Sequence, residues 1–348
     1  QQATMQFTVG YQLPDEGRET FVDIVKDYKD VIGEVYFPWP GIATGRAALN
    51  VSRGIVDWMT QATLERDLHE LKSMGMKLDL LLNANCNGQY ASSQFLENQV
   101  GSLITHLYDI LDGVDIVTTA SPAIAHILKK HFPDIEVRAS VNMRIGTYQG
   151  FEYSKSIFDS YCLQRDNQRN LDYLKNMKAL ADSMGKTLVL LANSGCFRYC
   201  PGQVFHDNMV AHEQEIDEVA PLEKWIPHTC WRHLKQRENW SAILQATWIR
   251  PEDLKHYADI VPTIKLATRM HQNPRMVIHA YATGKHYGNL VDLFEPGHGP
   301  AIAPYVIDNT LFPENWFEKT STCNSFCPTC NYCKNTLEKV LVKYDDFV

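Results

Sequence analysis

The chain has 348 residues, of which 45% are hydrophobic and 21% charged, an ordinary composition for one large globular domain or two small ones. Its formal net charge of −8 and isoelectric point near 5.9 argue against broad, nonspecific binding to nucleic acid or to anionic membranes. No stretch reaches the ~18 apolar residues of a membrane span, and the first residues have no leader-like pattern. We therefore expect a cytoplasmic protein that acts on a small molecule, with nucleic acid a less favoured ligand.

Eight short β-rich runs recur along the chain, at residues 6–9, 34–37, 77–83, 115–119, 136–141, 159–163, 187–193 and 261–266. Amphipathic stretches at residues 63–74, 95–111, 122–131 and 170–184 are long enough to form crossover helices. Eight such units in about 280 residues favour a closed barrel over an open sheet. There is no Gly-rich dinucleotide fingerprint and no P-loop. We predict an α/β fold, a TIM-like (β/α)8 barrel at residues 1–285 with a cysteine-rich extension at residues 286–348.

Polar residues follow several of these predicted strands, at the end where barrel enzymes keep their active sites. One such residue alone indicates little, because loop asparagines usually cap helices or form turns. Their coincidence at one face of the barrel indicates a site. The residues are Asn83, Asn85 and Cys86 after the third strand, Asn142 and Arg144 after the fifth, Gln164 and Asp166 after the sixth, Asn193 and Cys196 after the seventh, and Arg269 after the eighth.

The segment at residues 193–213 is dense in groups that bind metals. Cys196 and Cys200 are four apart, a spacing that lets both sulfurs face one metal on a turn. His206 and His212 follow, and Cys230 lies further along the chain. Each histidine is as consistent with a half-buried loop residue as with a ligand.

Four more cysteines, Cys323, Cys327, Cys330 and Cys333, lie within eleven residues near the C-terminus. This spacing lets one loop direct several thiolates to a common centre, either an iron–sulfur cluster or a structural zinc ion. Disulfides are a weaker alternative, because the cysteine count of nine is odd and we expect a reducing compartment.

Four stretches of the chain resemble peptidase family U32, collagenase-like proteins once classed as peptidases of unknown catalytic type. The I-R-P-E-D-L and F-K-I-x-G-R motifs in tandem are the most specific signal, although Thr268 stands where the second motif usually has glycine. The matching stretches are E-V-Y-F at 34–37 with T-G-R at 44–46, N-S-G-C at 193–196 with C-P at 200–201 and His206, W-I-R-P-E-D-L at 248–254, and I-K-L-A-T-R at 264–269.

The resemblance covers most of the chain up to about residue 284 and implies a TIM-like barrel. It also implies a 4Fe–4S cluster on four cysteines, because better-understood relatives use one for oxygen-independent hydroxylation in ubiquinone synthesis or of tRNA and rRNA bases. By position, Cys196 and Cys200 match the family's cluster cysteines, and Cys230 is a candidate third ligand. Cys86 or a tail cysteine is a candidate for the fourth, whereas Cys162 is expected to be a core residue.

We predict an iron–sulfur-dependent oxidoreductase or oxygen-independent hydroxylase of a small or aromatic substrate, with one or two 4Fe–4S clusters. Arg250, Lys265 and Arg269 are expected to hold a carboxylate, because cations at a barrel mouth suit anions. The alternative for the two arginines is an internal ion-pair network. The candidates for proton transfer are Glu252, Asp253 and His206.

Two other functions stay open at this point. One is a metal-assisted peptidase, although the sequence has no H-E-x-x-H, no G-x-S-x-G and no motif that pairs a cysteine with a histidine. The other is a noncatalytic barrel that relays electrons. The candidate protein partners are an electron donor or a homologous barrel subunit.

Overall fold

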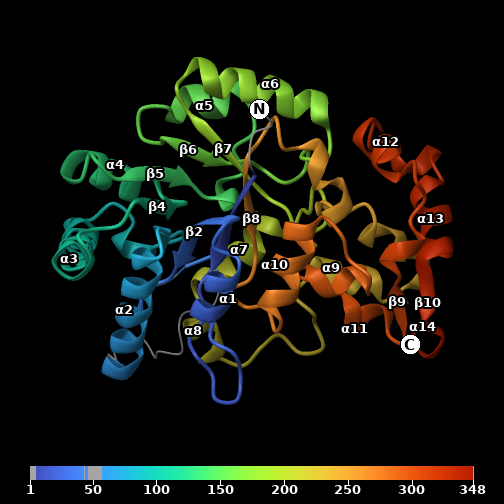
Figure 1. Ribbon diagram of the computed structural model, residues 1–348, viewed down its shortest axis with the longest axis horizontal. Helices are drawn as coiled ribbons and strands as arrows, with labels where there is room; N and C mark the ends of the chain where they lie inside the picture. The colour runs from blue at the N-terminus through green and yellow to red at the C-terminus, as the bar shows by residue number, and fades with distance from the viewer. Residues whose placement is uncertain (1–4, 43, 46–56, 348) are drawn as a thin grey trace.

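The computed structural model describes residues 5–42, 44–45 and 57–347. Eight parallel strands close into a barrel in sequence order, with β1 paired to β8, which confirms the predicted TIM-like fold (Figure 1). All eight predicted strands are present, each within a few residues of its predicted bounds. They are β1 Gln6–Gly10, β2 Ile32–Phe37, β3 Lys77–Leu82, β4 Ile116–Thr119, β5 Glu136–Ala139, β6 Ser160–Cys162, β7 Thr187–Leu191 and β8 Thr263–Leu266.

Helices cover the outside of the barrel, and their first turns carry the expected caps. Ser121 accepts a hydrogen bond from the backbone of Ile124 ahead of Pro122, and Asn170 caps the backbone of Tyr173. The outer helices are α1 Phe21–Asp27, α2 Trp58–Ser73, α3 Gln94–Leu111, α4 Pro122–His131, α5 Tyr148–Ser154, α6 Leu171–Ser183 and α10 Pro274–Thr283, with short 3₁₀ turns η1 Gly88–Tyr90 and η2 Val141–Met143 in two strand-to-helix loops.

A long insertion replaces the single helix expected between β7 and β8. It begins with the cysteine-bearing loop after β7 and returns to the sheet only at residue 263. Because such a segment is too long to lie along one strand, it can reach other loops of the barrel mouth. Its elements are α7 Gln203–Ala211, α8 Glu213–Asp217, α9 Thr229–Leu234, η3 Arg237–Ile243 and η4 Pro251–His256.

The C-terminal extension packs against the barrel through aromatic side chains. Trp316 of the extension stacks on Trp248 with ring centroids 5.8 Å apart, and the Arg169 guanidinium lies 4.2 Å from the Trp248 ring centroid. An antiparallel pair, β9 and β10, lies near the chain's end (Figure 1). The elements are η5 Leu290–Leu293, α11 Gly299–Ile302, β9 Tyr305–Ile307, η6 Asn309–Leu311, α12 Trp316–Ser321, η7 Cys327–Thr329, α13 Tyr332–Val340, β10 Leu341–Lys343 and α14 Tyr344–Phe347.

The inside of the barrel combines an apolar and a charged part. Val141, Cys162, Val189 and Leu191 form a small buried apolar cluster, which agrees with the core role expected for Cys162. Buried charged residues occupy another part of the interior. In the described part of the chain, no helix has the length and apolar character needed to cross a membrane.

Candidate functional site

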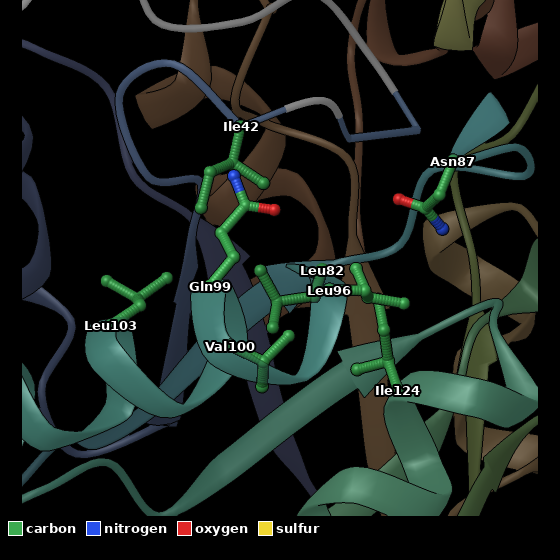
Figure 2. Close-up of a pocket in the computed structure, with 8 residues that line it drawn as sticks. All are labelled: Ile42, Leu82, Asn87, Leu96, Gln99, Val100, Leu103 and Ile124. Atoms are coloured by element: carbon green, nitrogen blue, oxygen red, sulfur yellow. The ribbon is translucent and has the colours of Figure 1, made fainter. Parts of the chain in front are cut away.

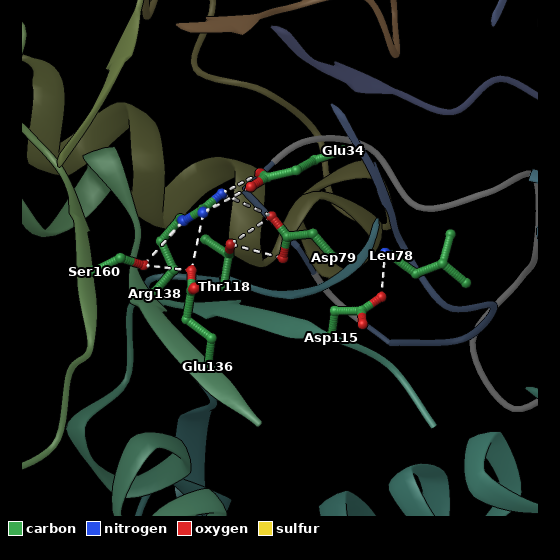
Figure 3. A network of polar contacts seen from close by, with 8 residues as sticks. All are labelled: Glu34, Leu78, Asp79, Asp115, Thr118, Glu136, Arg138 and Ser160. Carbon is green, nitrogen blue, oxygen red and sulfur yellow. Dashed lines mark hydrogen bonds and ion pairs between the residues drawn. The ribbon is translucent and has the colours of Figure 1, made fainter. Parts of the chain in front are cut away.

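A buried charged network lies inside the barrel around Arg138 of β5 (Figure 3). Arg138 Nη1 donates to Glu34 Oε1 at 2.7 Å, and Nη2 donates to Glu136 Oε2 at 2.9 Å. Asp79 accepts from Thr118 Oγ1 at 2.8 Å, and burial raises the pKa of its carboxyl. Because these contacts pair the buried charges, we interpret the network as a structural part of the barrel interior. Sequence reasoning missed it, although charged residues within apolar strands were a visible signal.

Lys265 and Arg269 lie together at the end of β8. Burial lowers the pKa of the Lys265 ammonium, the nearby Cys162 and Asp79 oppose that shift, and Arg269 adds to it. Lys265 Nζ lies 4.4 Å from the centroid of the Tyr36 ring. Two of the three cations predicted to bind an anion therefore belong to β8 and the loop that follows it. Arg46, in a stretch that carried the family resemblance, lies outside the described residues.

The third cation, Arg250, lies elsewhere, where the extension meets the barrel. Its Nε donates to Asn309 Oδ1 at 2.9 Å, and its guanidinium lies 4.5 Å from the Phe312 ring centroid. Glu252 Oε2 accepts from Asn309 Nδ2 at 2.8 Å, and Glu252 Oε1 lies 3.8 Å from Arg250 Nη2. Asp253 is buried beside them, and burial raises its pKa to about 6. These contacts match the ion-pair alternative for Arg250 and join the barrel to the extension.

Three cysteines, Cys196, Cys200 and Cys230, come together and are here called the barrel thiols. Burial, together with the nearby Cys196 and Cys200, raises the pKa of the Cys230 thiol to about 11. Close packing positions their segments: a Cβ on Gly202 would lie 3.7 Å from Cys200 Sγ and 2.4 Å from Thr229 Oγ1. Cys230 lies thirty residues after Cys200 in the sequence, and the shared ligation of these cysteines stays a prediction.

Asn193 and Gly195 hold the first part of this loop in place. The Asn193 side chain donates to the carbonyl oxygens of Ala267 and Leu293, each at 3.0 Å, and accepts from the Ala267 backbone at 2.7 Å. A Cβ on Gly195 would lie 1.9 Å from the Pro296 carbonyl oxygen. Only glycine permits this approach of two backbones, which explains the glycine just before Cys196.

Two histidines, His206 and His228, belong to the segments that carry the barrel thiols. His206 and His228 meet edge to face with ring centroids 4.9 Å apart, and His228 stacks on Trp231 at 3.9 Å. His228 Nδ1 is buried and has no hydrogen-bond partner among the described residues. His228 precedes Cys230 by two residues, so this nitrogen is a polar atom close to the thiols in sequence that needs a partner.

The tail thiols, Cys323, Cys327, Cys330 and Cys333, form a second group. Burial, together with the nearby Cys327 and Cys323, raises the pKa of the Cys333 thiol to about 11, although Arg169 opposes this shift. Cys330 is exposed. Arg198, between Cys196 and Cys200, donates from Nη1 to Ser325 Oγ at 3.1 Å. Ser325 lies between Cys323 and Cys327, so this hydrogen bond brings the two cysteine-bearing loops into contact.

Cys86 has different neighbours from the barrel thiols. It follows β3, and the His212 ring lies close by, since a Cβ on Gly88 would lie 3.9 Å from His212 Cε1. The interaction with His212 lowers the pKa of Cys86 and raises that of His212. The Gly88 backbone donates to Cys86 Sγ at 3.4 Å, and His212 Nδ1 lies 3.1 Å from Glu215 Oε2. The sequence indicated both Cys86 and His212 but gave no sign that they would meet.

A large open basin lies beside Cys200. Its volume is about 630 Å³, enough for a small molecule. All nine of its lining residues come from the positions after the fifth and sixth predicted strands or from the cysteine-bearing segment at residues 193–213. The basin is lined by Asn142, Met143, Arg144, Gln164, Asp166, Tyr199, Cys200, Pro201 and Val204.

A second, apolar recess lies between α3 and the end of β3 (Figure 2). Leu82, Leu96 and Val100 line it, with Asn87 at one side. Its volume of about 20 Å³ holds little more than one water molecule. The basin is therefore the better candidate for binding a substrate.

The donor set of the barrel thiols suits a soft metal centre, because thiolates favour zinc and iron–sulfur clusters. All nine cysteines are free thiols. Within the described ranges, no three His, Cys, Asp or Glu side chains are arranged as a ready site for a single metal ion. Cys196, Cys200 and Cys230 therefore fit such a centre by residue type.

Comparisons with known proteins bear on the family. No family model matches the chain. An uncharacterized protease of Methanocaldococcus jannaschii is 26% identical over 327 residues, which cover 92% of each protein. The solved structure of a U32 peptidase, Mk0906, superposes with a TM-score of 0.53 at 13% identity and covers 77% of this chain and 94% of its own. The first finding is a full-length relationship to a named protease, and the second is a shared fold.

Proposed function

Since its full-length relative and its fold support placing the chain with the U32 peptidase family, we propose that it is an iron–sulfur-dependent oxidoreductase or oxygen-independent hydroxylase. Its substrate would be a small or aromatic molecule bound in the basin beside Cys200. The proposal is supported by the proximity of Cys196 and Cys200 to Cys230, which contributes to the raised pKa of the Cys230 thiol.

The protonation of the barrel thiols supports a metal centre. Mutual repulsion and burial keep the Cys230 thiol protonated, so three thiolates cannot coexist there without a compensating positive charge. A bound iron–sulfur cluster would supply that charge together with one-electron transfer. Cys196, Cys200 and Cys230 would hold it, and we leave the fourth position to a tail cysteine or to the substrate. Zinc remains the alternative at the tail thiols.

Contact between the two cysteine-bearing loops favours redox chemistry over hydrolysis. The Arg198 to Ser325 hydrogen bond joins a residue between two barrel thiols to a residue between two tail thiols. Centres held by adjacent loops are suited to pass electrons to one another. Because Cys330 is exposed, an electron-donor protein would reach the tail centre first.

Substrate binding would use the cations of β8 and its loop. Neither Lys265 nor Arg269 lines the basin, so a substrate carboxylate that they hold would extend from the basin toward the end of β8. His206, in α7 near the barrel thiols, is the proton-transfer candidate that remains at this end of the barrel. Arg250, Glu252 and Asp253 serve the contact with the extension and have no part in this proposal.

The test is the iron, sulfide and zinc content of protein purified without oxygen, with its visible spectrum before and after dithionite. Two 4Fe–4S centres predict about eight irons, matching sulfide, and a broad absorbance that dithionite bleaches. Cys230→Ser and Cys333→Ser should each remove one centre. Zinc at the tail predicts about four irons and one zinc, with only Cys230→Ser removing the iron. Protein without iron or bleaching would overturn the proposal.

A further inference from the structure

Cys86 and His212 come from opposite sides of the barrel. Cys86 follows β3, whereas His212 belongs to the insertion after β7, four strands away in a ring of eight. A second contact joins the same segments, because Asn85 Nδ2 lies 3.4 Å from Asp207 Oδ2 of α7. A Cβ on Gly88, whose N–H donates to Cys86 Sγ at 3.4 Å, would lie 3.9 Å from His212 Cε1. The insertion therefore crosses the barrel mouth and places the His212 imidazole beside the Cys86 thiol.

His212 is oriented by a carboxylate. Its Nδ1 lies 3.1 Å from Glu215 Oε2, one helical turn further along. With Nδ1 directed at Glu215, Nε2 is the ring nitrogen that can exchange a proton with the thiol. A carboxylate in this position fixes the ring orientation and stabilises the imidazolium that forms.

We propose that Cys86, His212 and Glu215 form a nucleophilic site that transfers acyl groups from esters, thioesters or amides to water. Cysteine, histidine and a carboxylate linked in this order are the parts such a site needs: a nucleophile, a base in contact with it and a group that orients the base. The site is independent of iron at the barrel thiols. The lowered pKa of the thiol and the Gly88 N–H on its sulfur are further support.

The reaction needs no oxidant, reductant or metal. Cys86 Sγ, having given its proton to His212, attacks the carbonyl carbon, and the π electron pair moves to the oxygen. When this pair returns, the bond to the leaving group breaks, and His212 gives its proton to the departing oxygen, sulfur or nitrogen. Water, deprotonated by His212, then attacks the thioester, which releases the acid and restores the thiol.

The surroundings favour an apolar acyl group. Tyr90 and Phe95, four and nine residues after Cys86, are exposed, and their rings meet at a tilt of 34° with centroids 4.5 Å apart. Such an exposed aromatic pair can cover an apolar chain bound beside the thiol. No thiol is among the main influences on Cys86, so a disulfide exchange site with a neighbouring resolving cysteine is not supported.

The experiment uses p-nitrophenyl butyrate with the intact protein purified without oxygen. We expect a burst of p-nitrophenol and a butyryl group on the peptide that contains Cys86, located by mass spectrometry. Cys86→Ser should abolish the burst, and His212→Asn should slow acylation by about 10²-fold. His69→Asn, a change of an exposed histidine on α2, should leave the burst unchanged.

Iron content separates this inference from the proposed function. Cys86→Ser that retains the iron of the wild type and loses the burst supports the inference. Loss of iron in Cys86→Ser to the extent seen in Cys230→Ser would make Cys86 a cluster ligand and overturn it. Butyryl groups spread over several cysteines, or a burst unaffected by His212→Asn, would also overturn it. Wild-type protein without iron would refute only the redox proposal.

Discussion

Cys86 and Cys230 are two thiols of one barrel mouth whose acid strengths are shifted in opposite directions. Cys230 lies among other thiols and is partly buried, which raises its pKa to about 11. Cys86 meets an imidazole and a backbone N–H, which lower its pKa. The comparison shows that a cysteine's neighbours, more than its position after a barrel strand, decide its chemistry. Thiols that repel one another call for a metal, whereas a thiol beside histidine is ready to act as a nucleophile.

The largest expected difference is in iron content, when Cys230 and Cys86 are each replaced by serine in separate variants. Cys230→Ser should lose all the iron of the barrel centre, because a serine hydroxyl is a poor substitute for a thiolate ligand. Cys86→Ser should keep it. Iron and sulfide analysis of both variants, purified side by side without oxygen, measures the difference. Equal loss in the two would assign both cysteines to one cluster.

The next effect concerns the imidazole beside Cys86. At pH 7 iodoacetamide should alkylate Cys86 more slowly in His212→Asn, because loss of the imidazole raises the pKa of the thiol and lowers its thiolate fraction. The sign follows from the lowered pKa: in the wild type the thiolate persists below the ordinary thiol pKa, and the variant needs higher pH. His212 and Glu215 are the titratable groups that act on this thiol. An unchanged pH profile would remove His212 from the pair.

A third prediction disturbs the barrel thiols without changing a cysteine. Gly195→Ala should lower the free energy of unfolding by about 3 kcal/mol and reduce iron content, because the new Cβ would meet the Pro296 carbonyl. Urea unfolding measures the change. Gly101→Ala in α3 is the matched control, since a Cβ there has open space and should stabilise the helix slightly. Equal behaviour of the two variants would contradict the close approach at Gly195.

The smallest expected effect is on the pH dependence of stability, because burial raises the pKa of the Asp253 carboxyl just as it raises that of the Cys230 thiol. The folded protein raises the pKa of Asp253 from 3.8 to about 6, so it favours the protonated form. The contribution of Asp253 to the free energy of unfolding is therefore fully present below pH 3.8 and is lost as pH rises through 6. Asp253→Asn removes the charge and should gain about 2 kcal/mol at pH 8 but nothing near pH 4. A loss of stability at pH 8 would show that the carboxylate is well paired.

The hydrophobic pattern predicted the barrel well because the burial of each strand is visible in its own residues. The eight strands could be found from local sequence alone, without information on distant contacts. The bounds of α4 likewise match the predicted range. The grouping of Cys196 with Cys200 follows from their short spacing, whereas the shared centre with Cys230 stays a prediction.

Other parts of the site could not be predicted because they depend on where the long insertion turns. Arg250 belongs to a motif of the resemblance, yet its position beside Asn309 is set by the packing of the extension. The meeting of His212 with Cys86 requires the insertion to cross the barrel mouth, which no local pattern reports. A pairing between segments so far apart in sequence becomes visible only in the folded chain.

The most direct test of the account is the alkylation rate of every cysteine in anaerobically purified protein, followed by mass spectrometry with and without an iron chelator. The account predicts that Cys86 reacts rapidly in both conditions, whereas Cys196, Cys200 and Cys230 are protected until the chelator removes iron. Protection of Cys86 together with the barrel thiols, released by the same chelator, would contradict it.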